Sequence, residues 1–156
     1  MISPEILRRY PFFGVLSPKQ IKAMAMIGEE ETYRKGAIIC EEGKPANALY
    51  ILLEGGLSLY YKSEAEFHPE SRKDFLVGEI SQGEVFGISA MIEPYTSTAT
   101  IKAEQDCHVI KFGVPELFQL IENDQQLYCR LMKEIAKSAM ERLAFARVQI
   151  AAAWAK

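Results

Sequence analysis

The chain has 156 residues, of which 49% are hydrophobic, and this size supports one globular domain with its own core. Its formal net charge of -3 provides no broad basic surface for DNA or RNA, so we expect no direct nucleic-acid partner. No stretch of about 18 apolar residues occurs and no basic segment leads into an apolar one, so the sequence predicts a cytoplasmic protein without a membrane partner.

The cysteines and histidines do not form a recognisable catalytic or metal site. Cys40, Cys107 and Cys129 are odd in number and far apart, without a CxxC pair that would hold zinc or an iron-sulfur cluster. We expect them to be buried, reduced thiols. His68 lies in a polar stretch, and His108 follows Cys107 on a predicted strand, where successive side chains point to opposite faces. The sequence therefore predicts neither an enzyme nor a metal site.

The N-terminal segment predicts two helices separated by an apolar loop. The first helix covers about residues 3–9, and the loop covers residues 11–16. The second helix begins at Ser17, which can act as the N-cap, with Pro18 at the first helical position and Gln20 at the third. One face of this helix carries Ile21, Met24, Ala25 and Gly28. That face should pack on the rest of the domain.

Short segments rich in β-branched and aromatic residues, separated by glycines, follow from Glu30 to Phe112. This pattern is typical of an all-β body. The predicted strands cover residues 31–33, 37–40, 48–53, 57–61, 74–80, 98–103 and 108–112. The polar stretch from Lys62 to Lys73 is predicted to be a mobile hairpin loop.

The period becomes helical after Val114. Pro115 suits a helix start, and Leu117, Phe118 and Ile121 form its apolar face. A final helix from about Gln125 to Ala155 contains neither glycine nor proline. Thirty helical residues span roughly 45 Å, which is more than packing on one small domain requires.

The final helix carries a heptad pattern. Apolar residues follow one another at alternating spacings of four and three: Met132, Ala136, Ala139, Leu143, Ala146, Ile150 and Ala153. We interpret this seam as the interface of a homodimer; the alternative is an amphipathic helix folded back on its own domain. The predicted organisation is thus a body over residues 1–124 and a dimerisation helix of the same domain over residues 125–156.

Three segments carry a resemblance to a known family. They are YRKGAII at residues 33–39, EGKPANALYILLEG at 42–55, and GEVFG at 83–87 followed by TATIKA at 98–103. In this order, between helices, they resemble the cyclic-nucleotide-binding domain of catabolite-activator-type regulators, over about residues 5–145. The resemblance implies a mainly β fold: a double-stranded β-helix, or jelly-roll-like β-roll, with N-terminal helices and a long C-terminal helix.

The third segment resembles the family's phosphate-binding cassette. Gly83 and Gly87 allow sharp turns, and a short helix beginning near Ser89 would direct free N–H groups at an anion. The resemblance suggests cyclic AMP, cyclic GMP or an altered small ligand as the occupant. The residues that would line this pocket are Phe86, Gly87, Ile88, Ser89, Ser97 and Thr98.

Two family side chains are missing from this pocket. Ile88 stands where most members have a glutamate for the ribose 2′-hydroxyl, and Ser97 stands where they have the phosphate-binding arginine. A hydrogen bond to a charged group contributes about 1.5–3 kcal/mol, so losing both would weaken cyclic AMP by about two to four orders of magnitude. Lys102 and Arg142 are the nearest replacement charges. We expect Lys102 on an outer face, and for Arg142, which aligns with the helix segment that covers the base, we favour a plain surface position.

Two functions fit the sequence. The first is a regulatory sensor in which pocket occupancy moves the hinge between the β-roll and the final helix. The second is a structural dimerisation or adaptor module with a non-functional pocket. The family's transcription factors continue into a helix-turn-helix, whereas this chain ends at Lys156. A stand-alone module with protein partners and a fragment of a regulator are both consistent with that.

Overall fold

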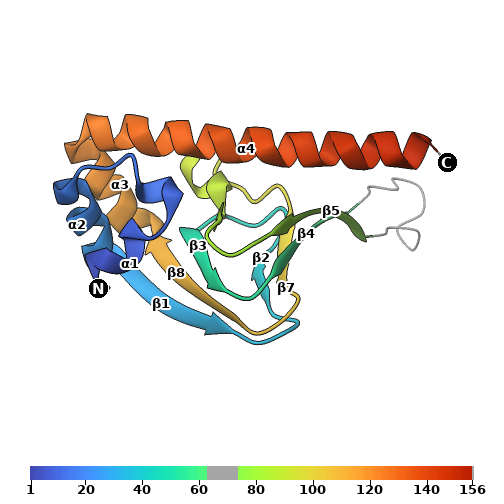
Figure 1. Cartoon of the computed structure of the whole chain (residues 1–156), viewed down its shortest axis with the longest axis horizontal. Coiled ribbons are helices and arrows are strands. Elements are labelled where there is room, and N and C mark those ends of the chain that lie inside the picture. The colour runs from blue at the N-terminus through green and yellow to red at the C-terminus, as the bar shows by residue number, and fades with distance from the viewer. Residues whose placement is uncertain (63–73, 156) are drawn as a thin grey trace.

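Two antiparallel four-stranded sheets form the body of the computed structural model, which describes residues 1–62 and 74–155 (Figure 1). One sheet has the order β1 (Gly28–Tyr33), β8 (Cys107–Gly113), β3 (Ala48–Glu54) and β6 (Val85–Phe86). The other has the order β2 (Ile38–Cys40), β7 (Thr100–Ala103), β4 (Leu57–Lys62) and β5 (Asp74–Ile80). The predicted β-roll is confirmed.

The strands depart from the predicted ones mainly at their ends. β7 begins at Thr100 rather than at residue 98, because the chain just before it is held elsewhere. The Ser97 amide donates to the Lys44 carbonyl, and the Ser97 carbonyl accepts from the Gly43 amide, both at 2.9 Å. β6 was not predicted, because a segment of two residues is too short to show the alternating hydrophobic pattern of a strand. Of the predicted hairpin loop, Lys62 belongs to β4 and the remainder lies outside the described residues.

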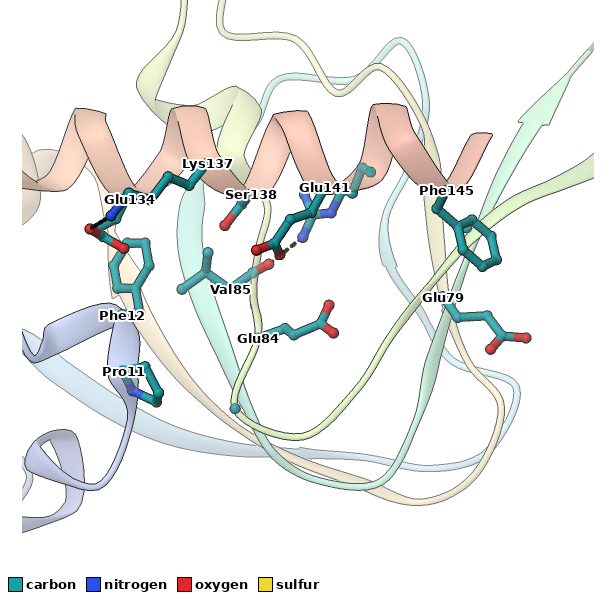
Figure 2. Close-up of a pocket in the computed structure, with 13 residues that line it drawn as sticks. Pro11, Phe12, Glu79, Glu84, Val85, Glu134, Lys137, Ser138, Glu141 and Phe145 are labelled. Atoms are coloured by element: carbon teal, nitrogen blue, oxygen red, sulfur yellow. Dashed lines mark hydrogen bonds and ion pairs between the residues drawn. The ribbon is translucent and has the colours of Figure 1, made fainter. Parts of the chain in front are cut away.

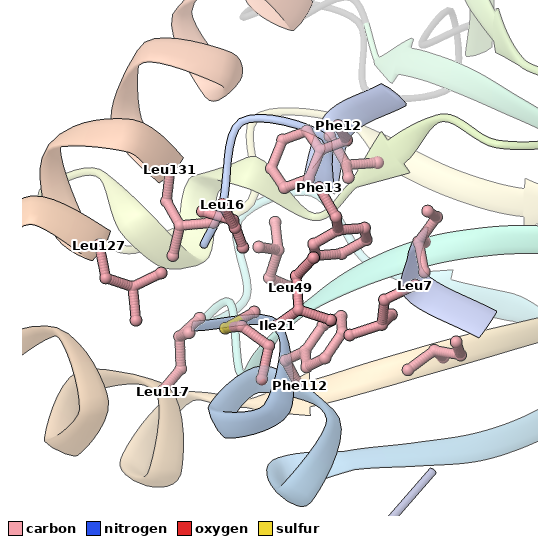
Figure 3. Packing of buried hydrophobic residues seen from close by; sticks show 14 of the residues in the cluster. Leu7, Phe12, Phe13, Leu16, Ile21, Leu49, Phe112, Leu117, Leu127 and Leu131 are labelled. Carbon is pink, nitrogen blue, oxygen red and sulfur yellow. The ribbon is translucent and has the colours of Figure 1, made fainter. Parts of the chain in front are cut away.

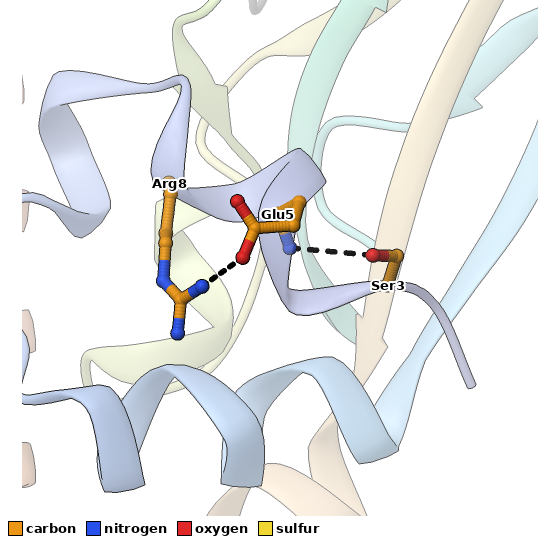
Figure 4. Close-up of polar contacts among 3 residues, drawn as sticks. All are labelled: Ser3, Glu5 and Arg8. Atoms are coloured by element: carbon orange, nitrogen blue, oxygen red, sulfur yellow. Dashed lines mark hydrogen bonds and ion pairs between the residues drawn. The ribbon is translucent and has the colours of Figure 1, made fainter.

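Side-chain caps define the N-terminal helices. In α1 (Pro4–Arg8), the Ser3 hydroxyl accepts from the Glu5 amide at 3.3 Å, and Glu5 also pairs with Arg8 (Figure 4). In α2 (Pro18–Ile27), Ser17 and Gln20 form the predicted reciprocal capping box, with bonds of 3.0 and 3.2 Å. The predicted loop between them contains a short 3-10 turn, η1 (Pro11–Phe13).

A hydrophobic cluster joins these helices to α3 (Val114–Asn123), to the start of α4 (Gln125–Trp154) and to the first sheet (Figure 3). Its members include Leu7, Phe13, Ile21, Leu49, Phe112, Leu117, Leu127 and Leu131. A second cluster fills the roll and includes Tyr50, Leu52, Phe86, Ile101 and Val109. The helical end and the roll therefore have separate cores on either side of the first sheet.

α4 runs along one side of the molecule, past the helices and then past the roll (Figure 1). Leu127, Leu131 and Ile135 are buried, but none of residues 136–154 is. The first part of the helix thus folds back on its own domain, and the remainder lies on the roll surface with large apolar side chains exposed. Within the part of the chain that the structure describes, no helix is long and apolar enough to cross a bilayer.

Gly87 connects β6 to a 3-10 turn, η3 (Ile88–Met91), with a φ of 71°. A Cβ atom there would lie 2.8 Å from the Ala48 carbonyl oxygen, whereas at Gly36, with a φ of 91°, it would meet nothing within 4 Å.

Substituting Gly36→Ala should lower the free energy of unfolding by about 1–2 kcal/mol through backbone strain alone. Gly87→Ala should cost at least about 1 kcal/mol more, because the backbone must also move. Urea denaturation measures both, and equal losses would contradict the crowding at Gly87.

Candidate functional site

A cavity of about 200 Å³ opens where the β6–η3 turn, the segment before β7 and α4 meet. We call it the cassette cavity. It is lined by Cys40, Leu59, Gly87, Ile88, Ser89, Ser97, Thr98, Ala99, Ile101, Ala139 and Arg142. Apolar groups, glycine and neutral hydroxyls make up most of this lining, so it is suited to a small and largely apolar occupant.

Five of the six residues predicted to line the pocket line this cavity, as does Arg142, the candidate replacement charge, but Phe86 does not. Phe86 is fully buried, and its ring stacks on that of Tyr50 with centroids 4.8 Å apart and planes 7° from parallel. Its place in the lining was therefore wrongly predicted. Phe86 holds the roll together, and the chain turns toward the cavity only at Gly87.

Backbone structure fixes the positions of the predicted polar residues Ser89 and Ser97. The predicted short helix begins at Ile88 as the η3 turn, one residue before Ser89. Ser97 is 8% exposed, and its amide and carbonyl are both bonded to the turn at residues 43–44. An occupant of the cavity would therefore meet the Ser97 side chain rather than its backbone.

Arg142 is not the plain surface residue that we favoured from the sequence. It is half-buried, and its guanidinium donates a hydrogen bond to the Val85 carbonyl oxygen, so it links α4 to β6. Burial lowers the pKa of Arg142, while the charges of Glu84 and Glu141 raise it. The distance between Arg142 and Val85 along the sequence explains why the sequence did not reveal this contact.

Lys102, the other replacement charge considered, is exposed on β7 between the buried residues Ile101 and Ala103. It therefore occupies the outer face, as predicted. The lining also includes residues that the sequence analysis missed. Cys40 and Leu59 come from β2 and β4, and burial raises the pKa of the Cys40 thiol to about 11. Strand alternation was the available signal for them.

A second cavity of about 320 Å³ lies between α4, η1 and the β5–β6 region (Figure 2). Its walls carry four carboxylates and two aromatic rings, namely Glu79, Glu84, Glu134, Glu141, Phe12 and Phe145. Arg142 lines both cavities. Burial raises the pKa of Glu84, and the positive charge of Arg142 lowers it. No sequence motif pointed to this cavity, since its residues come from separate elements.

The residues of the predicted helix seam differ in their surroundings. Met132 packs against the hydrophobic cluster of its own chain, and Ala139 lines the cassette cavity. Leu143 and Ile150 have 49% and 59% of their surface exposed. Ala136 is exposed, and Ala146 is half-buried. The end of the seam beyond Ala139 is thus the part open to a partner.

The thiols fit the predicted burial only in part. Cys107 is buried and Cys40 half-buried, but Cys129 is exposed, because it lies on the face of α4 that points away from the core. His108 is half-buried beside Cys107, with its Nε2 3.5 Å from Glu30 Oε2. Among residues 1–62 and 74–155, no group of three or more His, Cys, Asp or Glu side chains is placed to hold a metal ion.

Comparison with known proteins gives a consistent answer. The family model described as the cyclic nucleotide-binding domain matches residues 30–124. The crystal structure of a candidate cyclic nucleotide-binding protein from Geobacter metallireducens is 36% identical with a TM-score of 0.78, covering 92% of this chain and 99% of that one. The cAMP-dependent protein kinase regulatory subunit of Colletotrichum orbiculare is 27% identical over 139 residues, which are 89% of this chain.

This chain spans only about a third of that fungal subunit, since the match covers 33% of its length. The catabolite activator protein of Thermus thermophilus has the same fold, with a TM-score of 0.69 at 18% identity over 90% of this chain and 61% of that one. The matched family model alone covers more than half of the present chain. The chain therefore belongs to the cyclic nucleotide-binding domain family and is a regulatory domain with that family's β-roll fold.

Proposed function

We propose that this domain is a ligand-responsive switch that passes occupancy of the cassette cavity to α4. The observation that carries the proposal is the composition of the cavity wall. Most of the wall belongs to the roll, but Ala139 and Arg142 belong to α4. An occupant touches both parts, so its affinity depends on how α4 sits, and such differential affinity is what shifts a conformational equilibrium.

Cyclic nucleotides should bind this domain weakly. The cavity presents Ile88 and Ser97 where the family resemblance leads us to expect a ribose-binding carboxylate and a phosphate-binding guanidinium. The estimated loss of two to four orders of magnitude in affinity follows from those two missing contacts.

The second candidate function is an adaptor with an unused cavity. Its support is the volume of about 200 Å³, which is below the 300–1,000 Å³ typical of ligand pockets.

We further propose that residues 125–156 dimerise with the same segment of a second copy. Support comes from the large apolar side chains exposed beyond Ala139 on the predicted seam, namely Leu143 and Ile150. A parallel helix pair would cover them. The partner of this dimer would then be a protein and not a nucleic acid, in keeping with the net charge of -3. The expected location is the cytoplasm.

A thermal-shift experiment with cyclic AMP and cyclic GMP at 10 mM tests the switch. A ligand at ten times its Kd stabilises the folded state by about 1.4 kcal/mol, which should raise Tm by about 3–6 °C in a domain of this size. The variant Ser97→Arg places a guanidinium at the position where the family resemblance leads us to expect one and should bind cyclic AMP at least about tenfold more tightly. AMP, which lacks the cyclic phosphate, is the matched control. If neither protein responds, the adaptor function is favoured.

Labelling of Cys40 reports occupancy of the cavity directly. Because burial raises its pKa to about 11, only about one Cys40 thiol in a thousand is ionised at pH 8. Iodoacetamide should therefore modify the exposed Cys129 first and Cys40 about tenfold faster with each pH unit from 8 to 10. A bound ligand should slow Cys40 labelling alone, as followed by mass spectrometry of the peptides. Equal rates for the two cysteines at pH 8 would contradict the burial of Cys40.

Sedimentation equilibrium tests the dimer. Leu143→Glu and Ile150→Glu place two like charges, one from each chain, in the proposed seam, and each should weaken dimerisation by about 30-fold or more. Val148→Glu is the control, because Val148 is 67% exposed and lies on the opposite face of the helix from the seam. A wild-type monomer at 100 μM, or equal effects of the three variants, would rule out this interface.

A further inference from the structure

Arg142 is the one charged side chain among the eleven described residues that line the cassette cavity. The other ten are three larger aliphatic residues, three glycine or alanine residues, one cysteine, and the hydroxyl residues Ser89, Ser97 and Thr98. A single positive charge in an otherwise neutral, mostly apolar wall attracts an anion, and the attraction is stronger than in water because the site is partly desolvated. The cavity therefore has the electrostatic character of a site for a singly charged anion.

The guanidinium is held in place at the boundary of the two cavities. Its hydrogen bond to the Val85 carbonyl fixes it against β6. That bond occupies one of five N–H donors, so the planar group retains donors for a second acceptor. Glu84 and Glu141 line the second cavity and are not among the residues that line the cassette cavity. None of the eleven described residues that line the cassette cavity carries a carboxylate.

The positive charge of Arg142 comes from α4, whereas most of the cavity wall comes from the roll. Ala139 lies three residues earlier and lines the same cavity, so that face of α4 closes over the cavity. The roll itself contributes no charged group to the wall. A ligand anion would therefore be held by the helix, while the ligand body and its hydroxyl contacts would be held by the roll.

We propose that the cassette cavity binds a small organic carboxylate with an apolar body, and that Arg142 is its anion-binding residue. The carboxylate would accept charge-assisted hydrogen bonds from the guanidinium, which matches its planar geometry, and the body would rest on Ile88, Ala99 and Ile101. The volume of about 200 Å³ suits a ligand smaller than a nucleotide. This inference rests on the proposed function, because it names the ligand class and the coupling residue of the same switch.

Benzoate and its neutral amide, benzamide, are the matched probes. They have nearly the same shape and differ in charge, so titrating each into the ¹⁵N-labelled full chain isolates the anion. Benzoate at millimolar concentration should shift the amide signals of residues 88–89 and 97–99, and benzamide should bind at least about tenfold more weakly. Equal binding of the two probes, or no response to benzoate at 20 mM, would overturn the inference.

Variants of α4 test the assignment to Arg142. Arg142→Gln should weaken benzoate by about tenfold to a hundredfold, and Arg142→Lys should restore part of the loss because it keeps the charge. Arg147→Gln is the control, since Arg147 is exposed on the same helix and lines neither cavity. Unchanged benzoate affinity in Arg142→Gln would overturn the assignment.

The same samples separate this inference from the switch itself. If cyclic AMP shifts the cavity amides equally in wild type and Arg142→Gln while benzoate has no effect, the switch survives and the carboxylate inference fails. If benzoate binds through Arg142 but the signals of α4 do not respond, the ligand class holds and the coupling to α4 fails. The wild-type comparison of benzoate with benzamide needs no variant to fold.

Discussion

The packing of Leu127, Leu131 and Ile135 onto the helical end of the domain is the contact on which the rest of the site depends. These three side chains are buried in a cluster shared with α1, α2, α3 and the first sheet. Burying three such side chains contributes about 4–9 kcal/mol before the cost of ordering them. Because a helix is a stiff rod, this contact also sets where residues 139–142 meet the roll. The wall of the cassette cavity is thus determined by packing that lies well outside it.

The same arrangement divides α4 into parts with different mobility. Up to Ile135 the helix is anchored by buried side chains, and beyond it no residue is buried. The hydrogen bond from Arg142 to Val85 ties the second part to the roll. A segment with few buried contacts opens at low free-energy cost. A ligand that adds contacts to Ala139 and Arg142 would therefore act on the weakest part of the helix–roll interface, where a modest binding energy has the largest effect.

Features that depend on neighbouring residues could be predicted from the sequence, and features that depend on distant contacts could not. The capping box of Ser17 and Gln20 follows from four consecutive residues, and the β-roll follows from its glycine-punctuated motifs. The turn at Gly87 likewise placed Ile88 and Ser89 at a cavity. Their signals are local, so they can be read without knowing what packs on them.

The wrong predictions concern side chains whose surroundings are determined by tertiary packing. Whether Phe86 faces the cavity or the core depends on Tyr50, which stacks on it from another strand. Cys129 is exposed because Leu127 and Leu131 direct the opposite face of α4 inward. The contact between Arg142 and Val85 spans 57 residues and depends on the direction of the helix across the roll. Periodicity gives the faces of a helix, but it does not give the surface on which each face rests.

The placement of the positive charge has a thermodynamic consequence for how such a domain signals. If the roll supplied the contacts to both the charged group and the body of the ligand, binding would stabilise the roll alone. It would affect α4 only through movement of the segment that joins the roll to the helix. When the charge comes from α4, the ion pair exists only while the helix lies on the roll, so its whole free energy counts toward the helix-docked state. Glu84, which belongs to the roll, also attracts Arg142 and so favours the docked helix before a ligand binds, whereas Glu141 lies on α4 itself. In the absence of ligand, α4 is therefore held on the roll at this point by the hydrogen bond to Val85 and the attraction to Glu84, and a ligand anion would add to these contacts only in the docked state.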